Sequence, residues 1–196
     1  MTKQKFENAL DAMDALNAND PNPIQIDGHD QPAALYYARQ MTKTLENLYP
    51  GASNALKLAA RAQHIERWKV PRDNYPKGRA GYHRWRNDLK ERHAKSASQI
   101  LRNCGFDEEL TTRVAGLIAK KNLKTDPETK ALEDVACIVF FKYYAAQFAP
   151  NHTSEKVANI IKKTWAKMTP LGRKHARELD LPESLKKQII ELSQDT

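Results

Sequence analysis

The segment 127–148 constrains the fold more than any other part of the chain, because its helical pattern is apolar on nearly all sides. It contains the run ALEDVACIVFFKYYAAQF. A helix of this kind is stable in water only when other elements surround it. Elsewhere apolar residues recur at helical spacing, and strand-like alternation rich in β-branched residues is hard to find. We therefore predict an all-α fold in which 127–148 is the central helix.

Proline, glycine and capping residues divide the rest of the chain into shorter predicted helices. A polar loop is expected over 18–30, and the run VPRDNYPKGRAG predicts a basic loop over 70–81. Because 196 residues are enough for one buried core, we expect a single domain over 1–196, with its core at about 20–178 and the helices of 154–193 packing on it. The expected architecture is a bundle of about eight or nine helices, over 5–17, 31–48, 54–68, 82–103, 107–121, 127–148, 154–167, 170–180 and 182–193.

The positive charge of the chain is concentrated in one segment. The formal net charge is +8, and the segment 61–102 alone holds twelve Lys or Arg against four Asp or Glu. A local excess of this size creates a field that attracts phosphates or carboxylates. The alternative is a helix face whose charges are simply solvated.

The chain carries no sequence signal for export or membrane insertion. It lacks an apolar run of about 18 residues, and its first residues lack the apolar stretch of a signal peptide. Cys104 and Cys137 match neither a disulfide framework nor a zinc-binding spacing, so we expect both to be buried small hydrophobes. A cytoplasmic protein without a membrane partner is predicted.

Two histidines and an aspartate are candidates for a metal site. His64 lies on the third predicted helix, and His93 lies within an inward-facing apolar stripe of the fourth. Asp134 lies in the apolar central helix, where a carboxylate is costly unless it meets a cation or a metal. Imidazole and carboxylate together are ligands of zinc, manganese or iron. The alternative is structural: hydrogen-bonded core histidines, and an ion pair of the carboxylate with Lys130 or an arginine.

The basic segment supplies candidate ligands for an anion. Arginine binds phosphate oxygens bidentately, and tyrosine rings offer stacking faces, although these aromatic rings can also be anchors of the core or the loop. The candidate substrate-binding residues are Arg61, Arg67, Arg72, Tyr75, Lys77, Arg79, Tyr82, His83 and Arg86. The candidate catalytic carboxylates are Glu66 and Glu133.

Three motifs carry a resemblance to a known family. They are QHIERW at 63–68, PKGRAGYHRWR at 76–86 and LEDVAC at 132–137. On these motifs, over about residues 20–178, the chain resembles an uncharacterised helical family, a domain of unknown function. That family in turn is distantly similar to the HD-domain phosphohydrolases, in which histidines and aspartates from several helices bind one or two metal ions.

The HD resemblance implies an HD-like helical bundle and, within it, a metal-binding set. The implied ligands are His64, His93 and Asp134. Ile65 stands where the HD pattern has an aspartate, and the second predicted helix has no histidine. The resemblance therefore leaves two possibilities open, a single metal ion with Glu66 or Glu133 completing the set, or a metal-free pocket.

Two functions follow as hypotheses. The first is an HD-like hydrolase that acts on a phosphorylated or nucleotide-like anion, with Mn, Fe, Zn or Co activating a water. The second is a non-catalytic RNA- or tRNA-binding module that uses the basic, aromatic-rich segment 61–102. A compact concave cluster of arginines would favour the small ligand, and a basic stripe on an exposed face would favour RNA.

Overall fold

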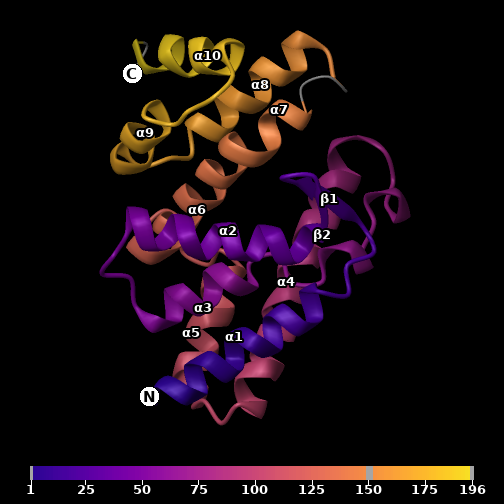
Figure 1. The fold of residues 1–196 in the computed structure, drawn as a ribbon, viewed down its shortest axis with the longest axis vertical. Helices are drawn as coiled ribbons and strands as arrows, with labels where there is room; N and C mark the ends of the chain where they lie inside the picture. Colours follow the sequence, from indigo (N-terminus) through magenta and orange to yellow (C-terminus); the bar gives the residue numbers. More distant parts are fainter. Residues whose placement is uncertain (1, 149–151, 195–196) are drawn as a thin grey trace.

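The computed structural model describes residues 2–148 and 152–194 of the chain, and most of them are helical (Figure 1). The helices are α1 (Lys3–Asn17), α2 (Ala33–Leu48), α3 (Asn54–Ala62), α4 (Gly78–Asn103), α5 (Glu108–Ile118), α6 (Pro127–Val139), α7 (Ala145–Phe148), α8 (Ser154–Trp165), α9 (Pro170–Arg177) and α10 (Glu183–Gln194). Shorter elements are the strands β1 (Pro23–Ile26) and β2 (His29–Pro32), the 3-10 turns η1 (Arg67–Lys69) and η2 (Arg72–Asn74), and the π-helical turn η3 (Phe140–Tyr144). The all-α class predicted from the sequence is confirmed. Among the described residues, no helix combines the length and the apolar character that crossing a membrane requires.

Helix α6 joins two apolar clusters. Leu132 and Val135 belong to a cluster built with α1 to α5, whereas Ile138 and the η3 residue Phe141 belong to a cluster built with α8, α9 and α10. In Figure 1, α6 rises from the N-terminal helices toward the C-terminal ones. The predicted central helix over 127–148 is observed as α6, η3 and α7 in succession. Its apolar surface on all sides is explained, since each half is covered by a different group of helices.

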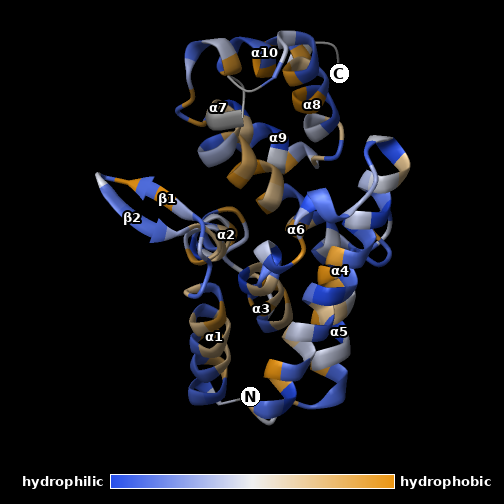
Figure 2. Cartoon of the chain, turned by 90° about the vertical axis from the view of Figure 1, so that its right-hand side faces the viewer, coloured by the Kyte–Doolittle hydropathy of each residue, from blue (hydrophilic) through white to orange (hydrophobic). Residues whose placement is uncertain are grey.

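A β-hairpin occupies part of the region that the sequence predicted to be a polar loop. The strands β1 and β2 pair antiparallel, with Ile26 opposite His29. Asp27 and Gly28 form the turn with positive φ angles of 51° and 81°, the conformation that Asp-Gly adopts in a two-residue hairpin. Figure 2 shows the hairpin standing away from the helices. The strands were missed because each has only four residues, too few for an alternating pattern to stand out.

Helix α3 ends at Ala62, six residues before the predicted end at Trp68. Hydrogen bonds from other helices hold the backbone after this point. The Glu66 amide donates to Oδ1 of Asn17 on α1 at 3.1 Å, and the Ile65 carbonyl lies 2.7 Å from Nδ1 of His93 on α4. These partners replace the bonds that a longer helix would have made. The QHIE segment is therefore a turn that is hydrogen-bonded to α1 and α4, rather than part of a helix.

Asp134 links α6 to the start of α9 through hydrogen bonds. Its carboxylate accepts hydrogen bonds from the Tyr49 hydroxyl at 2.7 Å, from the Thr169 amide at 2.8 Å and from the Thr169 hydroxyl. The side chain is fully buried. Gly172 on α9 allows this approach, because a Cβ there would overlap Cγ of Asp134. Three donors thus satisfy a buried carboxylate that would otherwise be costly.

Candidate functional site

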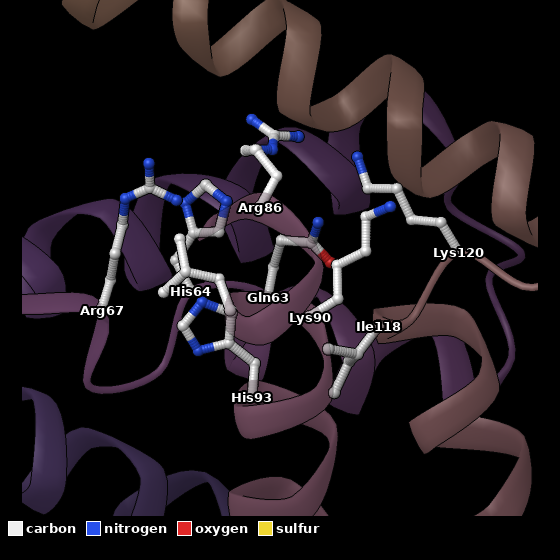
Figure 3. A pocket seen from close by; sticks show the side chains of 9 residues that line it. Gln63, His64, Arg67, Arg86, Lys90, His93, Ile118 and Lys120 are labelled. Atoms are coloured by element: carbon white, nitrogen blue, oxygen red, sulfur yellow. The ribbon is translucent and has the colours of Figure 1, made fainter. Parts of the chain in front are cut away.

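A small cavity lies between the turn after α3, the middle of α4 and the end of α5. Its lining residues are Gln63, His64, Arg67, Arg86, Leu89, Lys90, His93, Ile118 and Lys120. The cavity volume is about 10 Å³, which is room for about one water molecule. In Figure 3 the two imidazoles lie close together, and the charged ends of Arg86, Lys90 and Lys120 gather on one side. The cavity is therefore polar and strongly cationic.

Helix α4 contributes one face to this cavity. Arg86, Lys90 and His93 are four and three residues apart, the spacing that places side chains on one side of a helix. The turn after α3 brings Gln63, His64 and Arg67 to the same place, although they do not share a helix face. Lys120 arrives from the turn that follows α5, where it has a positive φ of 57°. The cavity is thus assembled from three segments.

His93 points a basic nitrogen atom into the cavity. Because its Nδ1 lies 2.7 Å from the Ile65 carbonyl oxygen, which can only accept, Nδ1 carries the proton in the neutral ring. The lone pair is then on Nε2, which is buried and has no hydrogen-bond partner among the described residues. Burial lowers the pKa of His93 from 6.5 to about 4, with the backbone hydrogen bond opposing this and Arg67 adding to it. At neutral pH His93 is an uncharged hydrogen-bond acceptor.

His64 is the second neutral imidazole of the site. Its ring stacks on Tyr37 with centroids 4.5 Å apart and an interplanar angle of 16°, and it lies 5.8 Å from the His93 ring. Burial lowers the pKa of His64 well below its usual 6.5, and the neighbouring Arg67 charge lowers it further. The structure thus brings together two of the residues that the sequence singled out.

The cations around the histidines outnumber the acids. Arg67 lies over the Trp85 ring at 4.6 Å, and within the described chain neither it nor Arg86 nor Lys90 has a carboxylate within ion-pair distance. Burial lowers the pKa of the Lys90 ammonium, and the charges of Arg86 and Lys120 lower it further. The charge of Glu133, which is already paired with Lys120, acts on Lys90 from beyond ion-pair distance, so none of these three cations has an ion pair of its own among the described residues. An anion bound among them would supply it.

The two candidate catalytic carboxylates are occupied in ion pairs. Glu133 is buried and pairs with Lys120, with Lys167 at 3.6 Å on its other side. Burial alone would raise the pKa of Glu133, but these lysines hold the pKa below its usual value. Glu66 pairs with Lys69. Neither carboxylate lines the cavity. Both neutralise a neighbouring lysine and do not face a ligand.

The structure does not assemble the predicted metal ligands His64, His93 and Asp134 into one set. Asp134 does not line the cavity of the two histidines, because its oxygens are bound to Tyr49 and Thr169. Across 2–148 and 152–194, no group of three or more His, Cys, Asp or Glu side chains could hold a metal ion. Two neutral imidazoles surrounded by positive charges also disfavour a divalent cation, which binds best where carboxylates or thiolates offset its charge. The residues of this cavity do not fit a metal.

Of the predicted substrate-binding residues, Arg67 and Arg86 line the cavity. Arg61 does not, since it is bound to Asp14 on α1 at 2.9 and 3.0 Å and to the Thr42 hydroxyl at 2.9 Å. Arg72 donates to the carbonyls of Tyr75 and Pro76, both at 2.9 Å, and so holds the loop that it belongs to. These two arginines have structural partners, which explains their positions without a ligand.

The remaining predicted substrate-binding residues lie outside the cavity. The Tyr75 hydroxyl donates to Asp88 at 2.9 Å. The others, Lys77, Arg79, Tyr82 and His83, are exposed at the start of α4. Tyr82 is 44% exposed, and its ring lies 5.8 Å from that of Trp85. Together they form a basic, aromatic surface beside the cavity rather than part of its wall.

Sequence reasoning missed three polar residues of the cavity, Gln63, Lys90 and Lys120. Lys90 could have been found, because it lies one helical turn from both Arg86 and His93 on the same face. Gln63 and Lys120 had no such signal. Each is positioned by a turn whose path depends on contacts with other helices.

Comparison with known proteins gives one family over nearly the whole chain. A family model described as Domain of unknown function (DUF4202) matches residues 7–189. No curated protein and no solved structure matches the chain. The family match includes every residue that lines the cavity.

Proposed function

The chain belongs to the DUF4202 family, and we propose that it binds the phosphate group of a small phosphorylated molecule against the cationic side chains around the cavity of α3, α4 and α5, outside the small space that has room for one water. One observation carries this proposal. Arg67, Arg86 and Lys90 converge on the cavity without a carboxylate partner among the described residues. Like charges brought together in a partly buried place repel one another, so an anion that binds there is stabilised strongly.

The arrangement favours phosphate over other anions. Arginine presents parallel N–H donors that match two phosphate oxygens, and a lysine adds a compact charge. A terminal phosphate carries up to two negative charges, which suits three unpaired cations better than a single carboxylate does. The cations stand around one small cavity, with Arg67 on the side of His64 and Lys90 on the side of Lys120, which supports a small ligand rather than a polymer (Figure 3). The hydrolase activity and the distant similarity to HD-domain phosphohydrolases, both expected from the sequence, stay predictions.

Calorimetric titration with inorganic phosphate and with pyrophosphate at low ionic strength tests the proposal. Replacing Arg86 with Ala should weaken binding by about 10- to 100-fold, because a hydrogen bond to a charged group contributes about 1.5–3 kcal/mol. Arg84→Ala is the matched control, since Arg84 is an exposed arginine of the same helix that does not line the cavity. Failure of both anions to bind at millimolar concentration would refute the proposal. Equal losses in the two variants would do the same.

RNA binding is a second candidate, favoured by the exposed basic surface at the start of α4. Lys77, Arg79 and Arg84 are exposed there beside Tyr82, whose ring can stack on a base. If this surface binds RNA, affinity should fall steeply with salt as phosphate contacts release counterions. Arg84→Ala should then weaken RNA binding and leave phosphate binding unchanged. Salt-independent binding, or none, would remove this candidate.

A further inference from the structure

Glu133 connects the edge of the cavity to a lysine from the C-terminal part of the chain. One of its carboxylate oxygens pairs with Lys120, which lines the cavity, and the other lies 3.6 Å from Nζ of Lys167. Lys167 follows α8 and lies between Trp165 and Met168, two residues of the apolar cluster built with α8, α9 and α10. Lys167 therefore adds a positive charge from the C-terminal helices to those that α4 and the turns after α3 and α5 supply.

The cations around the cavity and Glu133 outnumber the carboxylates that pair with them. The cations are Arg67, Arg86, Lys90, Lys120 and Lys167, and among the described residues Glu133 is the acid in both of the ion pairs that they form. Five positive charges and one negative charge leave a net charge of +4. Burial lowers the pKa of Lys90, and the charges of Arg86, Lys120 and Lys167 lower it further against the opposing charge of Glu133. The lysine from the C-terminal helices thus belongs to the same electrostatic group.

This net charge exceeds what one phosphate group can balance. A phosphate monoester carries about −1.5 to −2 at pH 7, so it would leave about half of the positive charge without a counter-ion. A second phosphate group would balance the remainder. Because like charges held close together repel one another, the second group should add to the affinity.

The positions of the cations also suit two phosphate groups. In Figure 3, Arg67 lies on the side of His64, the ammonium of Lys90 lies on the side of Lys120, and the guanidinium of Arg86 lies between them. Arg67, Arg86 and Lys90 are all partly exposed, so a ligand larger than the cavity can reach them. The cations are therefore spread across the mouth of the cavity instead of meeting at one point.

Lys167 is available to bind a ligand. Its side chain is 50% exposed. At 3.6 Å its ammonium is within ion-pair distance of Glu133 but too far for a hydrogen bond, so the pair leaves the three N–H donors of the lysine unused. Lys120 differs, because its side chain is 11% exposed and is hydrogen-bonded to the same carboxylate.

We propose that the ligand of this protein is a small molecule with two phosphate groups, and that Lys167 and Lys90 bind the second group while Arg67 and Arg86 bind the first. This inference rests on the proposed function and deepens it by naming the class of ligand. The ligand lies over the mouth of the cavity, since the space inside has room for about one water molecule. A bound ligand would thus connect the N-terminal helices to the C-terminal ones.

Two matched pairs of ligands test the proposal by calorimetry at low ionic strength. Fructose 6-phosphate is compared with fructose 1,6-bisphosphate, and inorganic phosphate is compared with pyrophosphate. In at least one pair, the compound with two phosphate groups should bind about 10- to 100-fold more tightly, the effect of an added hydrogen bond between charged groups. The pair with the larger preference distinguishes phosphate groups separated by a sugar from adjacent ones.

Lys167→Gln is the informative variant. It should weaken binding of the preferred two-phosphate compound about tenfold and change the affinity for its one-phosphate partner by less than about threefold. Lys167→Arg keeps the charge and should keep the preference. Lys163→Gln is the matched control, since Lys163 is an exposed lysine of α8 that forms no salt bridge with the described residues. Thermal melts check that each variant is folded.

The two proposals fail in different ways. Equal affinities within both ligand pairs would overturn this inference and leave phosphate binding standing. An unchanged preference in Lys167→Gln, or an equal loss in Lys163→Gln, would overturn it as well. Tighter binding of an oligouridylate than of any two-phosphate compound, with the same loss in Lys167→Gln, would assign these cations to RNA instead. If none of the phosphate compounds binds, the proposed function and this inference fall together.

Discussion

Lowering the pH from 7 to 4 should destabilise the protein through the buried imidazole of His93. Its pKa is about 4 in the folded state and 6.5 without burial, so the unfolded chain binds a proton first as the pH falls. The contribution to stability is fully present above pH 6.5 and is lost as the pH falls toward 4. For this 2% exposed side chain the loss is about 3 kcal/mol. His64 should add to this loss of stability at low pH, since burial also lowers its pKa in the folded state.

The His93→Asn variant isolates this contribution. It should lose about 3 kcal/mol less than the unaltered protein between pH 7 and pH 4, because Asn does not titrate. The measurement is urea unfolding followed by tryptophan fluorescence at pH 7, 5.5 and 4. His29→Asn serves as the control for the substitution itself, since His29 is exposed on the hairpin. Identical pH profiles for His93→Asn and the unaltered protein would refute the assignment of His93 as a buried neutral acceptor.

Three further substitutions test the packing and the charge balance. Gly172→Ala should cost about 1–3 kcal/mol of stability, measured by urea unfolding, because the new methyl group would overlap the buried Asp134 carboxylate. Arg61→Ala should cost about 1–3 kcal/mol by losing its carboxylate partner on α1, yet leave the phosphate affinity measured by calorimetry unchanged. Glu133→Gln should lower stability and tighten phosphate binding severalfold, since it leaves Lys120 as a further uncompensated cation at the cavity. Weaker phosphate binding in that last variant would contradict the charge balance described above.

The helical class was predictable because it depends on local pattern. The apolar segment around Leu132 and Phe141 indicated a surrounded helix, and the structure covers its two halves with different helices. Where the local sequence pattern was weak, the predicted secondary structure was wrong. The hairpin around Asp27 and Gly28 was missed, and α3 was extended past Ala62, because no breaking residue follows it and only contacts from α1 and α4 hold the turn.

The candidate site was predictable in part for the same reason. Arg86 and His93 lie on one face of α4, and helical spacing alone reveals this. Grouping Asp134 with the histidines failed, because adjacent residues on a helix point about 100° apart. Glu133 therefore meets the lysine beside the cavity, whereas Asp134 meets Tyr49 and Thr169 on another side of α6.

The sequence by itself determined the helical class, the central position of the 127–148 segment and the concentration of positive charge over 61–102, because periodicity and charge are properties of residues close together in the chain. Tertiary structure alone decided which charged side chains form an ion pair and which do not. Arg61 forms an ion pair with Asp14, while Arg67, Arg86 and Lys90 have no carboxylate within ion-pair distance in the part of the chain that the structure describes. That difference arises from contacts between distant segments, since an ion pair or a buried lone pair depends on what packs against it in space.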